Sequence, residues 1–163
     1  MKTDVRRFAV TALIAALYAG LTWGFSFMSF GSVQFRIAEV LNLMAFIDPF
    51  YGIGVVLGCF IANFTSPLGP IDVVVGTLAT AIAVIGISKC RSLFMASFIP
   101  VIANTLVSLE LTYIFGTPLW YNLITVAIGE FVVVVCAGYP LFRYLIYKNI
   151  LRPKAKPETS RIE

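Results

Sequence analysis

The chain has 163 residues, of which 60% are hydrophobic and only 12% are charged. Soluble domains carry about 25% charged residues, so this composition excludes a soluble protein and indicates one that is integral to a lipid bilayer. The net charge of +4 does not indicate a nucleic-acid partner, because the basic residues cluster at the termini and in one loop. The three cysteines are far apart and the chain has no histidine, which argues against disulfide, metal and redox sites.

Apolar segments separated by short loops fill most of the chain. A helix needs about 20 apolar residues to cross a bilayer, and a chain of this length has room for about six such helices. The predicted fold is therefore an all-α, six-helix transmembrane bundle that forms one domain over residues 1–150, followed by a disordered cytoplasmic tail over residues 151–163. The predicted membrane segments are residues 8–29, 36–47, 49–65, 70–88, 92–115 and 118–147.

The first segment follows Lys2, Arg6 and Arg7, which is also how a secretory signal begins. It is about twice as long as the apolar region of a signal peptide, and the rest of the chain is apolar too. We therefore interpret it as a first transmembrane helix.

The second segment is short, because twelve helical residues reach only about 18 Å. It is either tilted beside a folded-in loop or re-entrant, and we favour six full spans. Irregular backbone inside a membrane is tolerated only where protein or a wet cavity surrounds it. A short span beside Gln34 and Arg36 therefore indicates a cavity.

Prolines mark several boundaries. Asp48-Pro49 and Thr117-Pro118 each place a residue that can cap a helix before a proline suited to the first helical turn. Pro100 and Pro140 fall inside the fifth and sixth segments, where they predict kinks.

Lysines and arginines predict the orientation. If six segments cross the membrane, eleven of the twelve basic residues fall on one side. The positive-inside rule makes that side cytoplasmic, so we expect a multi-pass protein of the cell membrane with both termini in the cytoplasm. Only Arg36 lies on the outer half, three residues before Glu39, with which it can pair on one helix face.

Four carboxylates lie within or at the ends of the apolar segments, at Glu39, Asp72, Glu110 and Glu130. An acid that faces hydrocarbon costs roughly 2.5 to 3.5 kcal/mol, so such acids normally point into the bundle and mark a binding or conduction site. In the predicted topology all four lie in the outer half of the membrane or near its midplane. We therefore expect a polar pocket that opens outward.

Carboxylates and amides beside aromatic rings suit a small, flat ligand that is cationic or rich in hydrogen-bond donors. In the alternative interpretation, Glu39 only pairs with Arg36, Asp72 only caps the fourth helix, and Trp120 is an interfacial anchor. The predicted substrate-binding residues are Arg36, Glu39, Asn63, Asp72, Asn104, Glu110, Trp120 and Glu130.

Small residues recur on the first helix, at Ala12, Ala15, Ala16 and Ala19. In a bilayer such a face lets another helix approach closely. The residues alone leave open whether that helix belongs to this chain or to a partner subunit.

The chain has no phosphate-binding GxxxxGK[ST] loop and no HExxH or serine-histidine arrangement. We expect no cofactor, no catalytic residue and no ATPase site, so active uptake would take its energy from elsewhere. The residues leave two alternative functions. One is a solitary ion-coupled carrier in which Glu110 and Glu130 bind protons; the other is a membrane-embedded enzyme, which the residue types disfavour.

Motifs spread over residues 12–141 resemble the QueT family of queuosine-precursor transporters, which are substrate-binding (S) components of energy-coupling factor (ECF) importers. The stretch from Gln34 to Glu39 is the most specific of them. The others are Gly58 to Asn63, Asp72 with Gly76, Thr77 and Thr80, Pro100 with Asn104, Glu110, and Gly129 with Glu130.

This resemblance implies a six-helix S component that captures a deazaguanine from outside, such as queuine or aminomethyl-deazaguanine. It also implies a transmembrane scaffold subunit and two cytoplasmic ATPases as partners, with the face of Ala12 to Ala16 toward the scaffold. The S component would then carry its substrate inward by toppling in the membrane. The missing nucleotide-binding loop is expected in such a system, because other chains hydrolyse the ATP.

Overall fold

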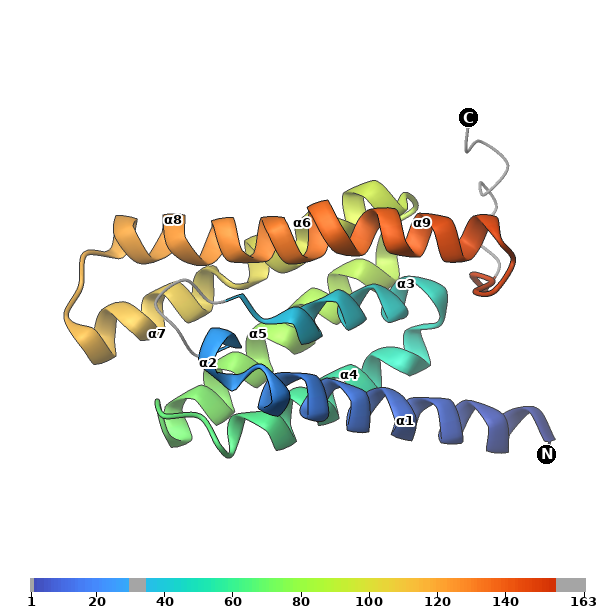
Figure 1. Ribbon diagram of the computed structural model, residues 1–163, viewed down its shortest axis with the longest axis horizontal. Coiled ribbons are helices and arrows are strands. Elements are labelled where there is room, and N and C mark those ends of the chain that lie inside the picture. Colours follow the sequence, from blue (N-terminus) through green and yellow to red (C-terminus); the bar gives the residue numbers. More distant parts are fainter. Residues whose placement is uncertain (1, 30–34, 155–163) are drawn as a thin grey trace.

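The computed structural model describes residues 2–29 and 35–154, and every regular element within these ranges is a helix (Figure 1). The prediction of an all-α protein is confirmed. Two of the elements are not α-helical, since η1 is a 3₁₀ helix and η2 is a π-helix. In chain order the helices are α1 (Lys2–Gly24), α2 (Ser26–Ser29), η1 (Ile37–Leu43), α3 (Met44–Ile47), α4 (Pro49–Asn63), α5 (Pro70–Lys89), α6 (Leu93–Ala103), α7 (Thr105–Phe115), α8 (Leu119–Glu130), η2 (Phe131–Gly138) and α9 (Tyr139–Tyr147).

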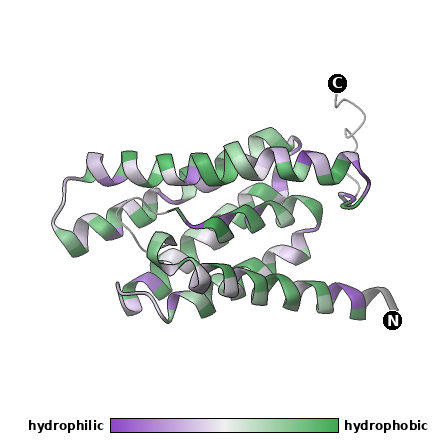
Figure 2. Ribbon diagram, viewed as in Figure 1, coloured by the Kyte–Doolittle hydropathy of each residue, from purple (hydrophilic) through white to green (hydrophobic). Residues whose placement is uncertain are grey.

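The helices run side by side along the longest axis of the molecule (Figure 1). Hydrophobic residues cover most of their length (Figure 2), and many large apolar side chains are exposed, which suits a surface in contact with lipid. Four stretches of the described chain are long and apolar enough to cross a membrane, and two apolar helices are shorter. The four are Val5–Gly24, Pro70–Lys89, Leu93–Phe115 and Leu119–Tyr147, and the two are Ile37–Ile47 and Pro49–Asn63.

The second predicted segment is short, as expected. It consists of η1 and α3, which together reach about 20 Å if a 3₁₀ residue rises about 2.0 Å and an α-helical residue about 1.5 Å. In Figure 1 it begins partway along the bundle and ends before the level of the N-terminal end of α1. Gln34 lies outside the described residues, and a full crossing by this segment stays a prediction.

Helices α1 and α4 pack with their backbones in contact. A Cβ atom added to Gly54 would lie 2.3 Å from the carbonyl oxygen of Thr11, and one added to Gly58 would lie 2.7 Å from that of Ala15. No side chain fits at either position without moving a backbone. These two glycines therefore set the distance between the first and third predicted segments.

We expect Gly54→Ala to destabilise the protein by about 1 to 3 kcal/mol, because the added methyl group overpacks a backbone contact. Thermal unfolding of the purified protein in detergent measures the effect. Gly20→Ala is the matched control, since a Cβ atom at Gly20 meets nothing within 4 Å. Equal unfolding temperatures for the two variants would contradict the close α1–α4 contact.

The fifth and sixth predicted segments are interrupted beside their prolines. Helix α6 contains Pro100 and ends at Ala103, and Asn104 separates it from α7. Proline has no N–H to donate and disturbs the turn that precedes it, so Pro100 weakens α6 itself, and the interruption follows four residues later. In the sixth segment the π-helix η2 separates α8 from α9, and Pro140 lies in the first turn of α9. Glu130 and Asn104 thus lie directly at the two interruptions.

Asp48 joins three parts of the chain at one end of the bundle. It caps α4, as predicted, by accepting a hydrogen bond from the Phe50 N–H at 3.1 Å. It also pairs with Arg7 of α1 at 2.8 Å and with Lys154 at 2.9 Å. Residues 152–154 of the predicted tail are therefore attached to the helices, and residues 155–163 lie outside the described residues.

The second predicted cap, at Thr117, is wrong. Helix α8 begins at Leu119, and the residue in the capping position is Pro118. The Thr117 hydroxyl instead accepts a hydrogen bond from the Asn122 amide at 2.8 Å.

The contribution of Asp48 to stability should depend on pH. Burial by itself raises the pKa of Asp48, but hydrogen bonds from Arg7 and Lys154 outweigh it and hold the pKa below its ordinary value. A carboxyl whose pKa is lowered by folding stabilises the protein at higher pH and loses that effect as the pH falls toward its folded-state pKa. The difference in unfolding temperature between wild type and Asp48→Asn should be constant near neutral pH and narrow below about pH 4. A difference that persists undiminished in acid would contradict this role.

Candidate functional site

The four predicted acids are all buried, at no more than 4% exposure. Each comes from a different part of the bundle. Glu39 lies in η1, Asp72 in the first turn of α5, Glu110 in α7, and Glu130 at the end of α8. The chain therefore brings carboxylates from four separate helices into its interior.

Arg36 lies among these acids. Its guanidinium is 3.9 Å from the Glu39 carboxylate and 3.8 Å from that of Asp72. Glu110 and Glu130 are buried in the same bundle. We call Arg36 and the four buried carboxylates the acidic cluster.

Glu39 accepts hydrogen bonds at both of its carboxylate oxygens. The Tyr18 hydroxyl donates a hydrogen bond to one carboxylate oxygen at 2.5 Å, and the Asn42 amide donates to the other. Tyr18 is fully buried, and sequence reasoning missed it. The signal was present, because a tyrosine in the middle of a membrane helix needs a partner for its hydroxyl group.

Asp72 does not cap α5, contrary to the alternative interpretation of the sequence. The capping position belongs to Gly69, and the Asp72 carboxylate accepts no hydrogen bond within the described residues. The Asn63 amide donates to the Asp72 backbone carbonyl at 3.0 Å. A Cβ atom on Gly76 would lie 2.7 Å from both the Asn63 amide nitrogen and the Asp72 carboxylate, so this glycine lets the two side chains approach.

Cys59 lies beside the acidic cluster and was also missed as a neighbour of the site. Its sulfur contacts the Asn63 amide at 3.5 Å and the Thr80 hydroxyl at 3.2 Å. The Thr80 hydroxyl also donates to the Gly76 carbonyl at 3.0 Å. These contacts link α4 to α5 close to Asp72. They leave the side-chain carbonyl oxygen of Asn63 without a hydrogen-bond donor among the described residues.

Many buried acceptors in this region have no hydrogen-bond donor among the described residues. Glu110 is the clearest case, because neither of its carboxylate oxygens accepts a hydrogen bond. Buried polar groups are nearly always hydrogen-bonded, so an unmatched set of acceptors needs an explanation. The acceptors are Asn42 Oδ1, Asn63 Oδ1, both carboxylate oxygens of Asp72 and of Glu110, and Glu130 Oε2.

Such an interior is matched to a ligand that brings hydrogen-bond donors and positive charge. Among the described residues of this region, four buried carboxylates accompany one buried guanidinium, and a buried excess of negative charge is costly unless a cation or proton joins it. A donor-rich or cationic molecule would satisfy the open acceptors and reduce the charge imbalance at once.

Comparison with known proteins agrees with this chemistry. Residues 8–147 match the family described as QueT transporter. The chain belongs to this family. The Queuosine precursor transporter QueT of Lactococcus lactis subsp. cremoris (strain MG1363) is 36% identical over 138 residues, which cover 74% of this chain and 80% of that protein. No solved structure matches the chain.

Membership of the QueT transporter family confirms the resemblance drawn from the sequence motifs. It identifies a membrane transport protein and implies that the chain is not a classical enzyme. Together with the apolar helices, it supports a multi-pass membrane protein.

The structure places two further predicted site residues in this QueT-family chain very differently. Asn104 is buried at the α6–α7 interruption. Trp120 is 65% exposed and stacks edge-on with Tyr121 at a centroid distance of 6.2 Å. It lies ten residues before Glu130, or about 15 Å along the helix axis, so the structure does not bring it into the acidic cluster.

The predicted partner-binding alanines of this QueT-family chain divide into two pairs. Ala15 packs against Gly58 of α4, and Ala19 is buried in the core. Ala12 and Ala16 are exposed, as is Gly20 on the same face. Internal packing therefore explains one pair, and the other is available on the surface of α1.

Proposed function

We propose that this chain is the substrate-binding S component of an ECF importer and captures a queuosine precursor from outside the cell. The substrate would be a deazaguanine such as queuine or aminomethyl-deazaguanine. The observation that carries the proposal is the buried excess of acceptors and negative charge around Arg36. Family membership and the name of the Lactococcus relative support the substrate class.

Deazaguanine chemistry fits the open acceptors of the acidic cluster. A guanine-like edge presents adjacent N–H donors, and one carboxylate can accept both of them. Glu110 is suited to this role because both of its oxygens lack donors, and Glu130 with Asn104 is the second candidate.

An aminomethyl arm adds a cation, for which Asp72 is the better partner. Both Asp72 oxygens lack hydrogen-bond donors within the described residues, with Arg36 at ion-pair distance. Glu39 already accepts from Tyr18 and Asn42, so we assign it the task of fixing Arg36. Asn63 would offer its open carbonyl oxygen to a donor of the substrate.

We propose that six segments cross the membrane, with η1 and α3 as the second, and that both termini are cytoplasmic. The start of α1 and the end of α9 lie at the same end of the bundle (Figure 1), and the basic residues of the sequence concentrate at these two places. A transmembrane scaffold subunit would dock on the exposed small-residue face of Ala12, Ala16 and Gly20, and two cytoplasmic ATPases would supply the energy.

Uptake of a labelled precursor tests this proposal against the solitary carrier. Cells that express the chain alone are compared with cells that also express the scaffold and ATPase subunits. We expect uptake only in the second case, and we expect the purified chain to bind queuine in calorimetry but not adenine. Uptake by vesicles that contain the chain alone, driven by a pH gradient, would instead establish an ion-coupled carrier.

A further inference from the structure

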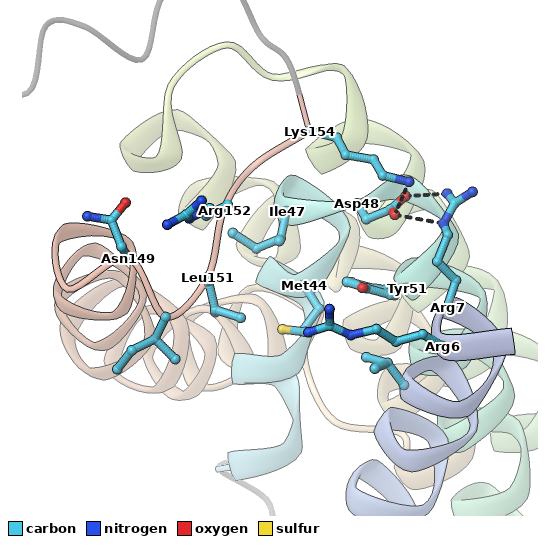
Figure 3. Close-up of a pocket in the computed structure, with 12 residues that line it drawn as sticks. Arg6, Arg7, Met44, Ile47, Asp48, Tyr51, Asn149, Leu151, Arg152 and Lys154 are labelled. Atoms are coloured by element: carbon cyan, nitrogen blue, oxygen red, sulfur yellow. Dashed lines mark hydrogen bonds and ion pairs between the residues drawn. The ribbon is translucent and has the colours of Figure 1, made fainter. Parts of the chain in front are cut away.

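A second pocket lies beside the N-terminal end of α1, away from α2. Here a pocket of about 560 Å³ opens between the start of α1, the α3–α4 corner and the segment after α9 (Figure 3). It is formed by parts of the chain far apart in sequence, and the proposed substrate site does not use it.

The pocket carries a strong positive charge. Among the described residues that line it, four are basic, at Arg6, Arg7, Arg152 and Lys154, and one is acidic, at Asp48. Arg7 and Lys154 share the Asp48 carboxylate (Figure 3). Arg6 and Arg152 form no ion pair with any other residue of the described chain. Within this described lining, four cations and one anion leave three positive charges in excess.

The remaining lining is largely apolar. Met44, Ile47 and Leu151 contribute hydrophobic side chains, and Tyr51 contributes a ring. Figure 3 shows the Arg6 side chain extending toward Met44, so a cation and an apolar surface lie next to each other. A small hydrated anion would satisfy the arginines and gain nothing from this apolar surface.

The position of the pocket selects the ligand. It lies at the end of helices that are apolar enough to cross a membrane, where lipid headgroups meet water. Basic pockets at this level of a membrane protein suit anionic lipid headgroups, and the apolar lining suits the adjoining glycerol and upper acyl chain. We propose that this pocket binds one anionic phospholipid, with the phosphate between Arg6 and Arg152.

The test compares lipids and matched variants of the full-length protein in detergent. Native mass spectrometry and thermal unfolding are recorded with phosphatidylglycerol, with phosphatidylcholine of the same acyl chains, and with inorganic phosphate. The variant is Arg6→Gln with Arg152→Gln. The control is Lys89→Gln with Arg91→Gln, which removes the same charge from exposed residues outside the pocket.

We expect wild type and control to retain one phosphatidylglycerol and to unfold at higher temperature in its presence. The pocket variant should bind this lipid about 30-fold more weakly, at about a tenfold loss per 1.4 kcal/mol and about 1 kcal/mol per basic residue. Equal weakening in the control would reduce the effect to net charge and overturn the proposal. Equal stabilisation by inorganic phosphate alone would assign the pocket to a free anion, and no retained lipid on wild type would refute the site.

Discussion

Replacing Glu110 by glutamine should weaken binding of queuine about 5-fold to 150-fold, which corresponds to about 1 to 3 kcal/mol. Glutamine has nearly the same size, so the site keeps its shape. It offers one acceptor in place of two and turns an amide donor toward donors of the ligand. Calorimetric titration of the purified protein in detergent measures the loss.

Trp120→Ala is the informative comparison for this variant. Trp120 was predicted from the sequence to bind the substrate. In the structure, however, it is 65% exposed and lies outside the acidic cluster. We expect Trp120→Ala to leave the affinity unchanged within about twofold, as is usual for a residue that does not contact the ligand. Unchanged affinity in both Glu110→Gln and Glu130→Gln would refute the acidic cluster as the substrate site.

Replacing Arg36 by methionine should cause the largest loss of stability, about 3 to 5 kcal/mol. The guanidinium is the counter-charge of Glu39 and Asp72, at 3.9 and 3.8 Å, and it is 4% exposed. Its removal leaves buried carboxylates without their cation in a region that water screens weakly. Denaturant unfolding in detergent measures this loss, and Arg91→Met, at an exposed arginine, is the control.

A second variant shows whether the loss comes from the charge itself. Arg36→Met combined with Asp72→Asn removes both partners of one ion pair, so it should be less destabilised than the two single variants predict together. A coupling energy of about 0.5 to 3 kcal/mol is expected for groups in contact. Additive effects would mean that Arg36 stabilises the fold by packing alone.

The sequence by itself determined that the protein is all-helical and approximately where its apolar helices lie. A charged fraction of 12% is incompatible with a soluble surface, and apolar runs as long as a bilayer is thick give helices because every backbone group must find its partner within the segment. The prolines and acids within these runs also predicted helix interruptions and buried polar groups. Pro100 and Pro140 lie beside the observed interruptions, and all four acids face the interior.

Only the tertiary structure decided which polar groups already have partners. Glu39 and Glu110 look alike in the sequence. In the structure, however, Tyr18 and Asn42 donate hydrogen bonds to the Glu39 carboxylate, whereas no described residue donates one to the Glu110 carboxylate. Likewise, Ala15 and Ala16 are neighbours in the chain, but only Ala15 packs against α4.

The physical reason is that burial depends on helix rotation and on contacts between distant segments. Periodicity along one helix sets which residues share a face, but it does not say which helix that face meets. Arg36 and Asp72 lie at ion-pair distance only because the start of η1 and the first turn of α5 meet in the folded chain. The charged residues within the apolar segments were therefore visible in the sequence, but which of them pair with one another was decided by the folded chain.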